Sequence, residues 1–227
     1  MRDVATDATR AYLAPAEYID SDHPEIRAEA LRLALPDAPP SDKARALFYA
    51  VRDIRYGYVD HDDLESYRAS SVLAARYGYC VGKAALYSAL CRAAGIPARI
   101  GFADVTNHLA TPRLLETMGT NIFAWHGYSE ILIGERWLRV SPTFNASLCD
   151  KFGVSPLEFD GANDALLQAF DTSGTVFMRY LRYHGSFHDV PAKFLRQEMA
   201  RLYPAVGKAG GLEGDMEAEA VRAVAKR

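Results

Sequence analysis

Two residues in this chain have the types and the placement needed for nucleophilic chemistry on a carbonyl group. Cys80 follows a tight-turn signal at Gly78 and opens a run of apolar residues at helical spacing that ends at Gly95. A cysteine at a helix N-terminus lies beside unpaired backbone N–H groups and the positive end of the helix dipole. This setting lowers a thiol pKa, so we expect an accessible thiolate at Cys80. A small buried cysteine would fit the same position.

His126 could serve as the base for that thiol. It lies on the first strand of the clearest β-hairpin signal in the chain, which runs from Ile122 to Ile133 and from Arg136 to Thr143. A general base takes the thiol proton and later returns it to the leaving group. A third group on the other imidazole nitrogen would fix the tautomer and the orientation of the ring.

The register of this hairpin decides which side chains accompany His126. The Gly134-Glu135 dipeptide fits a two-residue type II′ turn, which pairs Ile133 with Arg136 and Glu130 with Arg139. On this register one face is apolar and packs inward. The other face carries the polar side chains, namely His126, Tyr128, Glu130, Arg139 and Ser141. A slip of one residue would exchange the faces of one strand.

Four motifs, taken in order, resemble the transglutaminase-like superfamily. They are Gly78-Tyr79-Cys80-Val81-Gly82-Lys83-Ala84, Ala94-Gly95-Ile96-Pro97-Ala98-Arg99, Ala124-Trp125-His126-Gly127-Tyr128-Ser129-Glu130 and Trp137-Leu138-Arg139-Val140-Ser141-Pro142-Thr143. The resemblance implies an α+β fold with a papain-like core, in which the cysteine helix packs on an antiparallel sheet carrying the histidine. It also implies acyl transfer through a thioester, with Cys80 as nucleophile and His126 as base. The region from Asp20 to Tyr56 is similar to the helical lead-in of bacterial members.

The sequence departs from this family pattern just before Pro142. The family usually has an aspartate there, and this chain has Ser141. Serine can accept a hydrogen bond from the imidazole but brings no charge, so it stabilises an imidazolium less. Asn145 is the second candidate for the third member if the strand continues past Pro142, and Thr143 is another. Which residue replaces the aspartate stays open at this point.

Four further residues are candidates for substrate binding: Trp125 and Tyr79, which flank the pair in sequence, His108, in a long segment expected to form a rim or lid, and Trp137. Cys91 and Cys149 are expected to be structural. We expect no metal site, because neither the loop of residues 60–63 nor the pair His184 and His188 has convincing ligand spacing. The proposed chemistry needs no metal and no organic cofactor.

The bulk properties of the chain exclude several classes of protein. With 227 residues and a net charge of -3, the chain offers neither a basic surface for nucleic acid nor an apolar run long enough to span a membrane. No secretory signal opens the sequence, and three cysteines are an odd count, which favours reduced thiols in a cytoplasmic protein. We expect one domain over residues 1–206, with its core at about 40–190, and a flexible or helical tail over 207–227.

The sequence therefore predicts a cysteine-dependent acyl-transfer enzyme that acts on amide bonds of a peptide or protein, as a peptidase or amidase or by transamidation or deamidation. The alternative is a catalytically silent domain that binds a peptide or protein in the same cleft. The sequence leaves open the substrate, the choice between hydrolysis and transamidation, and the oligomeric state.

Overall fold

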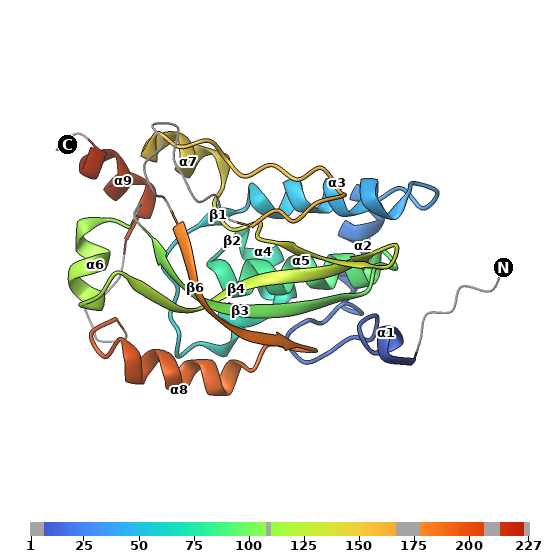
Figure 1. The fold of residues 1–227 in the computed structure, drawn as a ribbon, viewed down its shortest axis with the longest axis horizontal. Coiled ribbons are helices and arrows are strands. Elements are labelled where there is room, and N and C mark those ends of the chain that lie inside the picture. Colours follow the sequence, from blue (N-terminus) through green and yellow to red (C-terminus); the bar gives the residue numbers. More distant parts are fainter. Residues whose placement is uncertain (1–6, 108–109, 167–177, 207–213, 225–227) are drawn as a thin grey trace.

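The computed structural model describes residues 7–107, 110–166, 178–206 and 214–224 (Figure 1). The elements are α1 (Asp7–Ala11), α2 (Pro24–Leu33), α3 (Pro40–Arg52), β1 (Arg55–Tyr56), the 3₁₀ helix η1 (Leu64–Tyr67), α4 (Ala69–Ala75), β2 (Tyr77–Gly78), α5 (Cys80–Ala93), β3 (Ala98–Asn107), α6 (Pro112–Met118), β4 (Ile122–Ile133), β5 (Arg136–Val140), α7 (Ala146–Phe152), β6 (Met178–Phe187), α8 (Ala192–Leu202) and α9 (Met216–Val224).

A four-stranded antiparallel sheet forms the middle of the molecule. Its strand order is β5-β4-β3-β6, and a separate parallel pair joins β1 to β2. Helix α5 packs on one face of the sheet against β3 and β4, and α2, α3 and α4 surround its other sides. In Figure 1, α6, α7 and α9 gather at one end of the sheet, while α8 runs below it. Helices and an antiparallel sheet in these layers make the fold α+β, as the sequence predicts.

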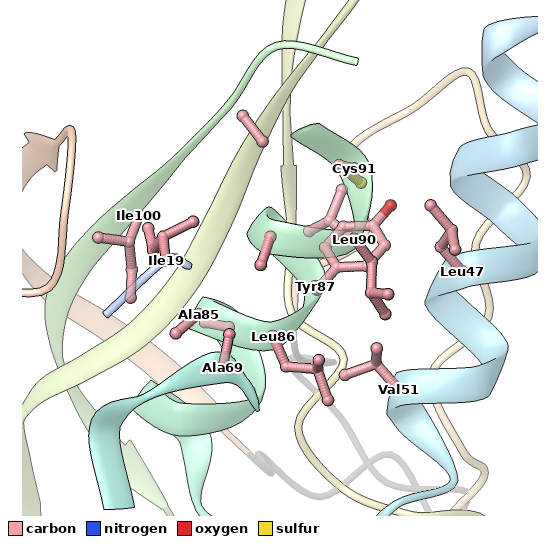
Figure 2. Close-up of a cluster of buried hydrophobic side chains, with 14 of the residues drawn as sticks. Ile19, Leu47, Val51, Ala69, Ala85, Leu86, Tyr87, Leu90, Cys91 and Ile100 are labelled. Atoms are coloured by element: carbon pink, nitrogen blue, oxygen red, sulfur yellow. The ribbon is translucent and has the colours of Figure 1, made fainter. Parts of the chain in front are cut away.

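Helix α5 begins at Cys80, as expected, but it is buried on every side rather than along one face. All residues from Val81 to Arg92 are buried. Figure 2 shows one of these contacts, where Leu86 and Leu90 of α5 face Leu47 and Val51 of α3. The reason for the full burial is that helices cover the sides of α5 that the sheet leaves open. The nucleophile candidate therefore starts a helix that the surrounding core holds firmly.

The hairpin register is confirmed. Ile133 pairs with Arg136, Glu130 with Arg139 and Ser129 with Val140. Strand β5 ends at Val140, so the expectation that it continues to Thr143 is wrong. After Val140 the backbone turns to another partner, because the Ser141 N–H donates to the Ala165 carbonyl at 2.9 Å.

Other expectations hold in part. The predicted rim segment after β3 contains helix α6, whose N-cap Thr111 accepts a hydrogen bond from Leu114 N; the sequence signal was missed because α6 spans only two turns. The sequence also suggests a turn and short strand over residues 155–159, but these residues form no strand. A short helix is expected from Ala165 to Phe170, and it lies almost wholly outside the described residues. A β-rich run is expected from Thr175 to Tyr183; its first residues are outside the described part, and the rest belongs to β6. In the part of the chain described here, no helix is both long and apolar enough to cross a membrane.

The last helix packs against the rest of the chain. Met216 and Ala220 of α9 are buried in a small apolar cluster with Leu114 of α6 and Leu148 of α7. Lys151 of α7 forms an ion pair with Glu217. The C-terminal segment thus contributes to the same end of the molecule as α6 and α7.

Candidate active site

The Cys80 sulfur lies at the first turn of α5 among several hydrogen-bond donors. The backbone N–H groups of Gly127, Val81 and Cys80 itself, together with the Tyr56 hydroxyl, point to it and lower its pKa. The side chain is partly exposed, whereas Cys91 and Cys149 are buried. Three backbone donors and one hydroxyl around a single sulfur form an environment suited to developing negative charge.

A glycine on β4 makes this contact possible. A Cβ atom on Gly127 would stand only 2.8 Å from the Val81 Cα, which is closer than real Cβ contacts allow. The absence of a side chain therefore lets the strand approach the N-terminus of α5, so that the Gly127 N–H reaches the sulfur.

The expected low thiol pKa at Cys80 is wrong for this arrangement. Burial raises the pKa of Cys80 to about 11, although the surrounding N–H donors and the Tyr56 hydroxyl lower it. Desolvation is the largest influence on the pKa of this thiol and outweighs the four donors. The helix N-terminus alone does not produce a thiolate here.

His126 lies on β4 immediately before Gly127, with only 5% of its surface exposed. Its Nε2 atom is 3.4 Å from the Ser141 Oγ, and that oxygen is 3.0 Å from the Thr143 Oγ1. Burial lowers the pKa of His126 to about 4. The resting imidazole is therefore neutral at pH 7, and Nε2 is the ring nitrogen that contacts Ser141.

A β-bulge sets the direction of the residues around His126. Ala103 pairs with His126 and Val105 with Phe123, so β4 has one more residue here than β3. Trp125 sits in this bulge with a positive φ of 57°, which non-glycine residues rarely adopt. Its backbone N–H donates to the Asp104 carboxylate at 3.1 Å.

The Trp125 side chain is also fixed. Its indole stacks on the His184 ring at a centroid separation of 4.0 Å, and His184 Nε2 is 2.7 Å from the same Asp104 oxygen. Trp125 therefore has a strained backbone just before His126, and contacts of both its backbone and its side chain hold it in place. These contacts fix the path of β4 next to the N-terminus of α5.

Cys80, His126, Trp125 and Tyr79 line one cavity of about 100 Å³. Tyr79 is the N-cap residue of α5, and its ring contacts Tyr67 and His61. The cavity brings together the nucleophile candidate, the base candidate and two of the four residues predicted to bind substrate. Among the described residues, no group of histidines, cysteines and carboxylates could hold a metal ion.

The family model of the transglutaminase-like superfamily matches residues 28–142, which is about half of the chain. The chain belongs to the transglutaminase-like superfamily. The match includes Cys80, His126 and Ser141, and it ends before Thr143. No curated protein matches the chain.

The solved structures that are similar to this chain include two proteins. One is a proposed cysteine protease from Cytophaga hutchinsonii, at 20% identity and a TM-score of 0.47, over 82% of this chain and 59% of that one. The other is described as a TGase, at 17% identity and a TM-score of 0.36, over 56% of this chain and 32% of that one. The chain thus spans less than two thirds of the length of either protein.

Within this transglutaminase-like core, Asn145 does not accompany His126. Its amide oxygen accepts the Tyr56 N–H at 2.9 Å, and its amide nitrogen donates to Ser147 and to Glu217 of α9. Asn145 is the N-cap residue of α7, because β5 has already ended at Val140. Of the two catalytic candidates for the third position, the structure puts Ser141 at the imidazole.

Trp137 is not among the residues that line the cavity with Cys80 and His126, so the structure does not bring it together with them. It pairs with Leu132, six residues along β4 from His126, which corresponds to about 20 Å of extended strand. Its indole contacts the Tyr12 ring and the Arg99 guanidinium instead. His108 lies outside the described residues.

Lys83 ties together the segments that carry the site, and its role was not predicted. The side chain is fully buried, and its Nζ donates to the carbonyls of Arg52, Ile54 and Thr143 at 2.9, 2.6 and 2.6 Å. Burial lowers the pKa of Lys83. Three carbonyl acceptors match the three N–H bonds of an ammonium group, so we assign the charged form. Lys83 thereby links α5 to the segment before Tyr56 and to the segment after Ser141.

Proposed function

We propose that this protein is a cysteine-dependent acyl-transfer enzyme that acts on an amide bond of a peptide or protein through a thioester on Cys80. The observation that carries the proposal is the shared cavity, in which the Cys80 thiol at the start of α5 accompanies a histidine whose far nitrogen contacts Ser141. Cys80 is the nucleophile, His126 the base and Ser141 the orienting group. The chemistry needs no cofactor.

The hydroxyls of Ser141 and Thr143 support one direction of proton transfer. If His126 Nε2–H donates to Ser141 Oγ, the Ser141 hydroxyl can donate in turn to Thr143 Oγ1. This chain leaves a lone pair on His126 Nδ1, which is the tautomer needed to take the thiol proton. Ser141 thus performs the orienting part of the usual aspartate's role without its charge.

The pKa values support a mechanism in which the thiol and imidazole rest as a neutral pair. The values of about 11 for Cys80 and about 4 for His126 differ by about 7, which corresponds to about 10 kcal/mol for moving the proton from sulfur to nitrogen. An ion pair at about 4 Å would recover only about 4 kcal/mol at an effective dielectric constant near 20. We therefore propose that His126 removes the proton as the sulfur attacks the carbonyl, rather than beforehand.

In the attack, the Cys80 sulfur forms a bond to the carbonyl carbon, and the proton passes to His126. The backbone N–H of Cys80 is the donor we propose for the oxyanion that develops. When the carbon–nitrogen bond breaks, His126 returns the proton to the leaving amine. Water or a second amine then attacks the thioester, which gives hydrolysis or transamidation.

The test is formation of an acyl-enzyme from a small activated substrate. We would incubate the full chain with S-phenyl thioacetate and locate the added acetyl group by peptide mass spectrometry. The proposal predicts acetylation at Cys80, with Cys91 and Cys149 as unreactive controls in the same chain. His126→Ala should slow the reaction by about 10²- to 10⁴-fold, the usual contribution of a general base. Ser141→Ala should slow it less.

A silent binding domain is the second candidate, and the observation that favours it is that His126 Nε2 contacts the uncharged Ser141 hydroxyl where the family usually has an aspartate. That reading predicts acetylation of Cys80 no faster than that of free N-acetylcysteine and no slower in His126→Ala. This outcome would overturn the proposed enzyme.

A further inference from the structure

The wall of the cavity beside Cys80 carries no charged side chain among the described residues. In a chain with 24% charged residues, none of the described residues that line the cavity is Asp, Glu, Lys or Arg. Its only histidines are His61 and His126, and burial lowers the pKa of each to about 4. At pH 7 the wall is therefore uncharged, and a charged group entering the cavity would meet no counter-ion there.

The hydroxyl groups of three tyrosines on this wall already form hydrogen bonds within the protein. The Tyr58 hydroxyl contacts Thr111 and donates to Glu219 at 2.9 Å. The Tyr203 hydroxyl accepts from Ala124 N and donates to the Ile122 carbonyl. The Tyr56 hydroxyl points to the Cys80 sulfur. The tyrosine rings are thus left to contact a ligand mainly through their apolar surfaces.

The methionines gather on the same wall. The chain has five methionines, and apart from Met1 every one of them lines this cavity: Met118 of α6, Met178 of β6, Met199 of α8 and Met216 of α9. Methionine side chains are flexible and polarizable, and they adapt to apolar ligands of varied shape. Four of them, from four different elements, line the cavity that contains the nucleophile candidate, and they form a surface that suits an apolar group.

Part of this wall lies outside the part of the chain that matches the superfamily model. Met178, Leu195, Met199, Tyr203 and Met216 all follow residue 142, where that match ends. Leu114 and Met118 of α6 lie within the matched region, as the catalytic pair does. The wall in front of the pair is therefore built from both the matched region and the C-terminal segment.

From these observations we infer that the acyl group transferred to Cys80 is uncharged and apolar, with an alkyl or aryl part next to the reacting carbonyl. The inference rests on the proposed function. The cavity would accept the acyl side of the substrate rather than the leaving group, because the acyl carbon stays bonded to the sulfur through both half-reactions. An apolar cavity of about 150 Å³ holds benzene, so a cavity of about 100 Å³ that opens to solvent suits a group of about four to six carbons.

A smaller, mostly apolar cavity lies next to this one and shares six lining residues with it: Tyr56, Asn107, Leu114, Phe123, Phe144 and Met216. Movement of the flexible Met216 side chain would join the two spaces. The inference therefore includes tolerance of acyl groups longer than the first cavity alone would hold.

The test measures acylation of Cys80 in the full chain by S-phenyl thioesters of acetic, butyric, hexanoic and adipic acid. In each reaction the sulfur–carbonyl bond forms, the bond to the phenylthio group breaks, and the thiol proton leaves with thiophenol. Rates are divided by those of N-acetylcysteine with the same thioester, which removes differences in intrinsic reactivity. Adipoyl is hexanoyl with a terminal carboxylate, so this pair isolates the effect of charge.

We expect the corrected rate to rise up to about fourfold for each added methylene, which makes hexanoyl tens of times faster than acetyl. Adipoyl should be at least tenfold slower than hexanoyl. Met199→Glu should reduce the hexanoyl-to-acetyl ratio, because it places a carboxylate in the wall. Gln197→Glu adds the same charge to an exposed position of α8 and should leave the ratio unchanged.

Two results would overturn the inference while the proposed function stands: equal corrected rates for all four thioesters, or an adipoyl rate as high as the hexanoyl rate. If no thioester acylates Cys80 in a His126-dependent manner, the proposed function itself fails. The thioester series uses the wild-type chain, so these outcomes do not depend on whether Met199→Glu folds.

Discussion

The two sides of the cavity around Cys80 are built in different ways. On the nucleophile side, α5 is buried all round, and Lys83 ties it to three backbone carbonyls. On the other side, four methionines from four elements line the same cavity. The contrast is between a nucleophile candidate held by a buried helix and a wall of flexible apolar side chains.

The largest effect of a single residue should follow from breaking the rigid side at Lys83. Lys83→Met keeps the length and the burial of the side chain but leaves three buried carbonyls without their donor. Each such group costs about 1 to 3 kcal/mol, so we expect the free energy of unfolding to fall by about 4 kcal/mol in urea titrations. Lys193→Met, at an exposed position of α8, is the control and should change it by less than about 0.5 kcal/mol. Equal effects of the two substitutions would contradict the structural role of Lys83.

The next effect is a loss of stability in acid that involves both sides of the cavity. Burial lowers the pKa of His126 and of His61 to about 4, below the value of about 6.5 for a free imidazole. The folded state therefore favours the neutral rings. This contribution is complete above about pH 6.5 and is lost as the pH falls towards 4, by about 3 kcal/mol for each ring. Urea unfolding between pH 7 and 4 measures it.

His61→Phe separates the two histidines. The ring contacts Tyr79 and Tyr67, so phenylalanine fits the same space and does not titrate. The variant should lose about half as much stability as wild type between pH 6.5 and 4. An unchanged pH dependence would mean that His61 is not held neutral in the folded protein.

The smallest effect on stability is expected for a substitution in the methionine-lined wall of the cavity. Met199 is half-buried, so Met199→Ala should lower the free energy of unfolding by only about 1 kcal/mol. Leu86→Ala, in the tightly packed contact between α5 and α3, should cost about 3 kcal/mol. Thermal and urea unfolding of the two variants measure this difference in stability directly. A loss at Met199 as large as at Leu86 would show that the wall is packed like the core.

Much of this architecture could be predicted from local signals. The start of α5 at Cys80 follows from a turn glycine and helical spacing, and the hairpin register follows from Gly134-Glu135. The contact of His126 with Ser141 then follows from the register. The end of β5 could not be predicted from local sequence. It depends on Ala165, which is distant in sequence and whose carbonyl accepts the hydrogen bond from the Ser141 N–H.

The features that were missed depend on tertiary contacts. The raised thiol pKa results from burial that the helix pattern of α5 does not reveal. The bulge at Trp125 contains no glycine that would mark it in the sequence. The contacts that hold it come from Asp104 and His184, which lie on other strands. The methionines are scattered between residues 118 and 216, so only the fold shows that they share one cavity.

The central claim is that Cys80 and His126 react from a neutral pair, with His126 acting as the base. The most direct measurement is the rate of iodoacetamide alkylation at Cys80 between pH 5 and 9, by mass spectrometry, in wild type and His126→Ala. The account predicts a nearly flat rate in wild type, since His126 is already neutral across this range, and a tenfold rise per pH unit in His126→Ala, where only the free thiolate reacts. Ser141→Asp should move the low-pH fall in rate upward, because a carboxylate raises the pKa of the imidazole. A wild-type rate that rises tenfold per pH unit, just as in His126→Ala, would contradict the account.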